Sequence, residues 1–348
     1  MTTRLESVRR FFDIRPGEGR AVVVAFLFVA LAVASFLLAK PIRNGLFLAE
    51  YGAYKLVYVY VAVPVVVSIA LSIYTRIAAR FGERTLFIAS LLFFALNVVA
   101  FWYLFRFRNV PGLPAIFYVW VNCFGIIAPV QAWTFANGLF DSRQARRLFG
   151  FVGSGASLGA ISGGLLAREL VPRLGTVNLL LVLAAMILLA ALVVATSYGV
   201  RGPERRDTPA ESLAPTLRES IALVRGSRYL TQIAAMVFLV AIVTQWTQFQ
   251  FSLAAEARFA ADPDRLTRLF GTFNFVLGLV ALGIQLFATG PSLRRFGVQV
   301  TILILPFALV MSSLATVIAP VLATVVITNA IDQAFRFSID KATFELLY

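Results

Sequence analysis

The sequence predicts an all-α integral membrane protein, a bundle of about ten transmembrane helices. Hydrophobic residues make up 60% of the 348 residues, and the mean hydropathy is +0.85, whereas soluble domains are only about 45–50% apolar. The apolar residues form successive runs of about 20, each long enough to cross a hydrocarbon core of about 30 Å as a helix. The chain is therefore expected to be a multi-pass protein with the lipid bilayer as its partner.

Each expected helix is an apolar run that ends at charged residues, glycine or proline. Residues 1–20 are too charged for a signal peptide and form an N-terminal segment. A bundle of six helices is expected over 21–200, a polar linker over 201–228, and an incomplete bundle of four helices over 229–348. The spans are placed near 21–40, 55–75, 85–105, 114–140, 148–170, 176–198, 229–252, 268–289, 297–318 and 320–337.

Lysine and arginine are unevenly divided between alternate loops. Of the 31 such residues, 21 fall in one set of loops and 10 in the other. Because cytoplasmic loops carry the excess of Lys and Arg, the richer set marks the cytoplasmic side. The N-terminus, the central linker and the C-terminal end all belong to that set.

A weak internal repeat relates the two bundles. ARFGERTLFI at 79–88 is similar to RRFGVQVTIL at 294–303, and both copies follow the second span of their bundle, as parallel repeats of six spans require. Twelve helices are then expected, so we expect this chain to be part of a longer protein. A second similarity pairs the Gly-rich span that begins near Arg146 with the one that begins near Thr267. Small residues on such a helix let a neighbouring backbone approach closely, and those concerned are Gly153, Gly155, Gly159, Gly163 and Gly164.

The composition argues against several functions. The net charge of +14 comes from residues between the apolar runs and forms no basic domain, so no nucleic acid partner is expected. There is no His, and the single Cys123 lies within an apolar run, where it is expected to pack; no metal site is expected. No nucleotide-binding or nucleophile motif is present. Neither a cofactor nor an enzymatic activity is predicted.

The end of the first span carries two cations. Lys40, Arg43 and Asn44 follow the apolar run, and Pro41 is expected to break the helix there. Two cations beside a helix break that faces a cavity would suit an anion site. The alternative is that both side chains merely extend to the membrane interface.

Amide side chains interrupt three other spans. The fourth carries several near Pro129, the seventh carries two that share one helical face, and the eighth carries one. Amides in a membrane either bind a sugar or a base of a substrate, or bond neighbouring helices to one another. The candidates are Asn122, Gln131, Asn137, Gln245, Gln248 and Asn274.

The last predicted span ends in charged residues. Asp332 and Arg336 are four residues apart and are expected to pair. The pair is either a gate or proton-coupling site, or a structural ion pair at the cytoplasmic mouth. Glu345 follows beyond it.

A family resemblance rests on three segments. The first is AKPIRNGLFLAEYGAYKLVYVYVAVPVVVSIALSIYTRIAARFGERTLFI at 39–88, with its Gly52-Ala53 turn. The others are WTFANGLFDSRQARRLFGFVGSGASLGAISGG at 133–164 and RFSIDKATFELLY at 336–348. In these segments the chain resembles the bacterial and plastid ATP/ADP translocases, nucleotide transporters related to the major facilitator superfamily.

The resemblance implies a major-facilitator-type bundle with alternating access, in a bacterial cytoplasmic (inner) membrane. Its implied substrate is a nucleotide such as ATP or ADP, or another small anionic metabolite. Arg43 matches one cation of the family's cavity, and Glu345 matches one acid. At Tyr58 to Tyr60 and near Asn122 and Gln245 the family carries charges that this chain lacks, so a substrate less charged than ATP is also expected.

The leading prediction is therefore a secondary active transporter. Two alternatives remain: a membrane-anchored sensor whose soluble domain lies beyond the present C-terminus, and a flippase for lipid-like substrates.

Overall fold

The computed structural model describes Arg15 and residues 17–108, 110–197, 223–259, 262–284, 311–315, 318 and 322–335. Within those ranges every regular element is a helix. In chain order they are α2 (Gly19–Tyr51), the short 3₁₀ helix η1 (Ala53–Lys55), α3 (Leu56–Ala78), α4 (Glu83–Phe107), α5 (Leu113–Leu139), α6 (Ser142–Leu174), α7 (Leu179–Thr196), α9 (Arg228–Phe259), α10 (Pro263–Gly283) and α12 (Leu322–Phe335).

Eight spans in the described ranges are long and apolar enough to cross a membrane. Helices satisfy their backbone hydrogen bonds internally, which the hydrocarbon interior demands. The predicted fold class, an all-α multi-pass membrane protein, is confirmed. The predicted span at 320–337 corresponds to α12, whereas most of the span at 297–318 lies outside the described residues. The predicted repeat copy at 294–303 lies outside them as well.

Aspartates begin two of these helices. The Asp141 carboxylate accepts from the amides of Arg143 and Gln144, and the Gln144 side chain accepts from the Asp141 amide, so α6 begins with a capping box. The Asp262 carboxylate caps α10 by accepting from the amides of Asp264 and Arg265, and Pro263 occupies the first helical position. These caps fix where the two helices begin.

The expected helix break at Pro41 is wrong. Helix α2 runs without interruption through Pro41 and ends at Gly52, about three turns beyond the predicted span. A proline removes one helical hydrogen bond, and a membrane helix tolerates this where neighbouring helices contact the freed groups. Pro129 likewise lies inside an uninterrupted α5.

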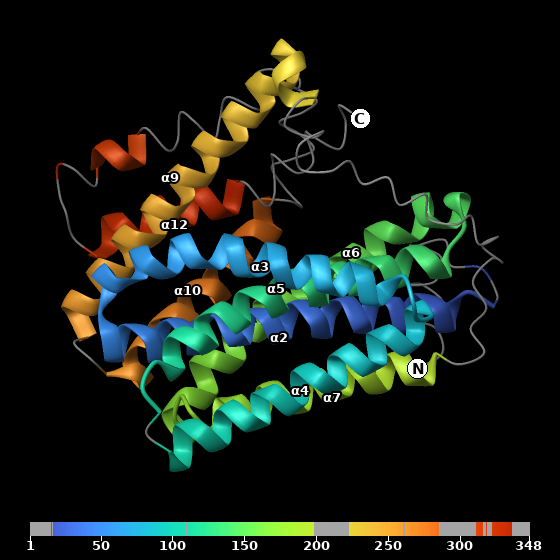
Figure 1. Cartoon of the computed structure of the whole chain (residues 1–348), viewed down its shortest axis with the longest axis horizontal. Helices are drawn as coiled ribbons and strands as arrows, with labels where there is room; N and C mark the ends of the chain where they lie inside the picture. The colour runs from blue at the N-terminus through green and yellow to red at the C-terminus, as the bar shows by residue number, and fades with distance from the viewer. Residues whose placement is uncertain are drawn as a thin grey trace.

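Helix α2 is the central element of the molecule, packing against α5, α6, α7 and α10 (Figure 1). Its contact with α6 is a seam of small residues. A Cβ atom on Gly155, Gly159 or Gly163 would collide with the α2 backbone. The close approach predicted for the glycine face is confirmed for these three glycines, which recur every four residues on one face. The placement of Gly153 and Gly164 on that face is wrong, because Gly153 faces Trp133 and Gly164 faces α10.

The opposite side of α6 packs against α10. A Cβ atom on Gly164 would collide with the backbone of α10 near Phe275, and one on Gly271 of α10 would collide with Ala167. Helix α6 is therefore held closely between α2 and α10, which brings segments more than 100 residues apart in the chain into contact.

Two apolar clusters divide the core. The larger one lies among α2 and α4–α7, and the smaller joins the end of α2 and η1 to α9, α10 and α12. We refer to α2–α7 as the N-terminal set and to α9, α10 and α12 as the C-terminal set. Figure 1 shows α9 meeting the N-terminal set where α2 ends and diverging from it toward its own N-terminus. Residues 234–243 in that diverging part are all exposed.

Candidate functional site

A buried arginine lies in the second half of α2. Arg43 is 7% exposed, and its guanidinium stacks on the ring of Tyr118 of α5, with Cζ 4.3 Å from the ring centroid. Its Nε donates to Oδ1 of Asn44 at 3.3 Å. Its Nη1 has no hydrogen-bond partner among the described residues. One donor of a buried cation is therefore left for a ligand.

A chain of polar side chains starts one turn earlier on α2 and crosses to the C-terminal set. Lys40 Nζ donates to Oε1 of Gln333 at 3.4 Å, and Gln333 Nε2 donates to Oδ1 of Asn329. The same oxygen accepts from Nε2 of Gln248 at 3.4 Å. Lys40 and Arg43 are three residues apart and share one face of α2. The Lys40–Gln333–Asn329–Gln248 chain thus links α2, α12 and α9.

The arrangement is rich in hydrogen-bond donors. Besides Arg43 Nη1, the buried Nδ2 of Asn329 lacks a partner among the described residues. No carboxylate in the described ranges forms an ion pair with Lys40 or Arg43. Two cations in the membrane-spanning α2 and an unpaired amide donor in the apolar helix α12 suit a ligand that carries negative charge and hydrogen-bond acceptors.

The other predicted amides lie elsewhere. Gln131 of α5 is buried and donates to Tyr74 of α3 at 3.0 Å and to Ser90 of α4 at 2.7 Å, so it bonds three helices of the N-terminal set. Asn122 donates to the backbone oxygen of Tyr118 within its own helix. The remaining three are not part of the polar chain: Asn137 and Gln245 are exposed, and Asn274 is buried in α10.

The predicted charged pair at the end of the last span remains a prediction. Asp332 lies in α12, but its side chain is outside the described part of the structure, as are Arg336 and Glu345. Where side chains are described, no three His, Cys, Asp or Glu residues gather in a way that would hold a metal ion.

Three members of the site, Tyr118, Asn329 and Gln333, were not among the predicted residues. Tyr118 carries the stacking surface for Arg43, and Gln333 holds Lys40. Tyr118 lies four residues before Asn122, so a shared helical face was the available signal. For Gln333 the available signal was its position four residues after Asn329.

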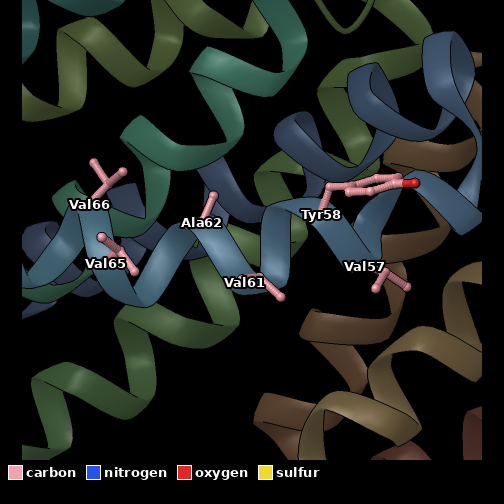
Figure 2. A pocket seen from close by; sticks show the side chains of 6 residues that line it. All are labelled: Val57, Tyr58, Val61, Ala62, Val65 and Val66. Atoms are coloured by element: carbon pink, nitrogen blue, oxygen red, sulfur yellow. The ribbon is translucent and has the colours of Figure 1, made fainter.

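A separate pocket of about 550 Å³ lies on the outer face of α3. Figure 2 shows that its lining side chains all come from one stretch of that helix and that Tyr58 carries their only oxygen. It offers no charge to an anionic ligand. The lining residues are Val57, Tyr58, Val61, Ala62, Val65 and Val66.

Comparison with known proteins identifies a transporter family. A family model described as TLC ATP/ADP transporter matches residues 114–336, from α5 to α12. Two curated relatives are the proteins named ADP,ATP carrier protein 1 in Chlamydia trachomatis serovar D and in Chlamydia muridarum. Each is 25% identical over an alignment that covers 67% of this chain and 52% of the relative. The chain thus spans about half the length of the curated relatives that it matches.

Proposed function

The chain belongs to the TLC ATP/ADP transporter family, and from this premise we propose that it acts in secondary active transport and moves a nucleotide or another anionic metabolite. Membership places it among transporters rather than enzymes. The names of the two Chlamydia relatives make ADP and ATP the first substrates to test. The proposed membrane is the bacterial cytoplasmic membrane, with the N-terminus in the cytoplasm.

The observation that carries this proposal is the unpaired donor of Arg43. A charged side chain buried in a membrane-spanning helix is costly unless it is paired. Arg43 has a stacking partner and a neutral amide, but no carboxylate among the described residues. A phosphate or carboxylate of the substrate would supply the missing charge, and the nearby Lys40 would add a second cation.

The amides provide the neutral part of the proposed recognition. Gln248, Asn329 and Gln333 come from α9 and α12, whereas both cations come from α2. A substrate bound between them would contact both sets of helices. Such a site suits alternating access, in which two helix bundles move about a substrate held near the middle of the membrane.

The test is uptake into proteoliposomes that contain the complete protein. Labelled ADP, ATP and other anionic metabolites would be compared for the parent, Arg43→Ala and Arg43→Lys. We expect Arg43→Ala to lower uptake by about tenfold or more, since charge-assisted hydrogen bonds contribute about 1.5–3 kcal/mol. Arg43→Lys should retain part of the activity because the charge remains.

Arg173→Ala is the matched control, because Arg173 is an exposed arginine in the last turn of α6. Its uptake should equal that of the parent. Gel filtration of every variant would verify folding. Unchanged uptake in Arg43→Ala would refute the anion site, and failure of every anionic substrate in the parent would refute the transporter proposal.

A further inference from the structure

Two carboxylates of the C-terminal set bind backbone amides of the N-terminal set. Oε2 of Glu256, near the end of α9, accepts from the amide of Ala53 at 2.7 Å. Oδ1 of Asp264, in the first turn of α10, accepts from the amide of Thr176 at 2.7 Å. Both distances lie at the short end of the range for N–H···O bonds, as expected for a charged acceptor.

The two amides follow the same backbone turn. Helix α2 is ended by Gly52, with φ 73° and ψ 169°, and α6 is ended by Gly175, with φ 76° and ψ 158°. Each glycine amide bonds back into its own helix, to Leu48 or Val171. The next amide lies outside the helix, and this is the one that the carboxylate binds. Positive φ strongly favours glycine. Gly52 and Gly175 adopt the same backbone conformation, and each directs the amide of the next residue toward the C-terminal set.

The same end of the molecule carries further contacts between the sets. The hydroxyl of Thr176 lies 3.1 Å from the Pro263 oxygen and 3.1 Å from the Thr267 hydroxyl. Gly45 of α2 lies against Thr267 so closely that a Cβ atom would collide with it. The other half of α9 diverges from the N-terminal set. The sets are therefore joined at the end where α2 finishes.

We propose that Glu256 and Asp264 form a two-point fastening between the sets, in which each carboxylate accepts a hydrogen bond from the amide that follows a helix-ending glycine. The fastening holds this end of the molecule closed and must break when the end opens. Its role in transport rests on the proposed alternating-access function. Asp264 is exposed and Glu256 half-buried, so water can solvate both carboxylates after separation. The fastening is consequently reversible.

The experiment measures how often this end opens. Cys123→Ala removes the only thiol in the sequence, and Thr176→Cys then supplies a reporter at a side chain that is 2% exposed. The protein would be placed in lipid nanodiscs, where both faces are accessible, so the result does not depend on orientation. The labelling rate with a membrane-impermeant maleimide would be measured without substrate for Glu256→Gln, Asp264→Asn and the double variant.

We expect the double variant to label about tenfold faster than the parent, and each single variant to lie between them. An amide side chain still accepts a hydrogen bond but loses the charge, which roughly halves the strength of such a bond. If the double variant is not obtained folded, the single variants decide. Labelling at the parent rate in the folded variants would overturn the proposal.

Two matched controls separate the fastening from a general loss of charge. Asp262→Asn changes the cap of α10, where the carboxylate accepts from the amides of Asp264 and Arg265 and pairs with the Arg265 guanidinium. Glu169→Gln changes an exposed carboxylate that pairs with its neighbour Arg168. Both should label at the parent rate. Equal acceleration in the controls would overturn the proposal, because the effect would then not be specific.

The labelling result is independent of the transport result. Faster labelling in a protein that transports no anion would leave the fastening intact and refute the proposed function. If the parent transports an anion but the carboxylate variants label at the parent rate, the proposed function stands and the fastening is refuted.

Discussion

Gly52 and Gly175 offer a direct comparison at the scale of single residues. They have nearly the same φ, so an alanine at either position carries about the same backbone strain. Their surroundings differ. A Cβ atom on Gly52 would lie 2.7 Å from Oε1 of Glu256, whereas one on Gly175 would lie 3.7 Å from Oδ2 of Asp264, which is an ordinary contact. Only the first substitution should displace a carboxylate.

A double-mutant cycle tests this difference. We expect Glu256→Gln to lower the stability of the parent and of Gly175→Ala by similar amounts, and to have little further effect in Gly52→Ala, where the bond to Ala53 is already lost. The coupling energy between Gly52→Ala and Glu256→Gln should be about 1 kcal/mol. Thermal unfolding of the purified variants in detergent would measure it. Equal coupling for both glycines would contradict the collision.

Glu18 gives a prediction that depends on pH. Burial by itself raises the pKa of this carboxyl, but the amide of Arg15 and the side chains of Arg147 and Gln144 outweigh it and hold the pKa below its usual value of 4.5. The Arg147 guanidinium lies 2.6 Å from Oε1. Because the folded pKa is lowered, the contribution of Glu18 to stability is present above pH 4.5 and is lost as pH falls through the folded pKa.

Glu18→Gln should therefore lower the unfolding midpoint at pH 7 by about 1–3 °C, the effect of a modest ion pair. The difference from the parent should shrink as the pH is lowered below 4.5. Glu169→Gln serves as control. Because Glu169 is exposed, this variant should have the same unfolding midpoint as the parent at pH 7 and below pH 4.5. A difference for Glu18→Gln that grows toward acid pH would contradict the lowered pKa.

At the scale of helices, the sequence predicts which helices form better than it predicts which helices pack against each other. The apolar runs place eight spans correctly because burial in lipid depends on length and composition alone. The end of α2 was missed since a proline usually marks a helix boundary in soluble proteins. Which helices pack together depends on contacts between residues that are far apart in the sequence. The glycine face of α6 predicts a close neighbour, but nothing in it identifies α2 or α10 as that neighbour.

The candidate site could also be predicted only in part from the sequence. Lys40 and Arg43 stand out because cations in a span are rare. Gln333 becomes visible only when α12 is placed beside α2. Gln131 is equally polar in sequence, yet it bonds helices of one set to each other. Residue type alone therefore does not separate a ligand-facing amide from a structural one.

The seam between α2 and α6 supports a prediction for one helix pair. Gly159→Ala should lower the unfolding midpoint by roughly 3–10 °C, because the added methyl meets the backbone of Ala30 and Ala34, which cannot turn away as a side chain does. Gly150→Ala is the control on the same helix. No atom lies within 4 Å of its Cβ position, so its midpoint should stay equal or rise. Helix propensity favours alanine at both positions, so equal losses would show that the loss at Gly159 does not come from the seam.

At the scale of the whole molecule, the orientation in the membrane decides which side the fastened end closes. The distribution of Lys and Arg predicts that the N-terminus, before α2, lies in the cytoplasm. The fastening is at the opposite end of α2, so it would close the outer side of the membrane. The diverging half of α9, in which residues 234–243 are all exposed, would then lie toward the cytoplasm.

Labelling at the two ends of α4 tests this orientation. Phe81 precedes the helix, Val110 follows it, and both are exposed. In cells that express a variant lacking Cys123, an impermeant maleimide should label Val110→Cys directly and Phe81→Cys only after the membrane is permeabilised. The permeabilised sample is also the control that each cysteine is reactive. The reverse pattern would place the fastening on the cytoplasmic side, and labelling of both cysteines in intact cells would mean that α4 does not span the membrane.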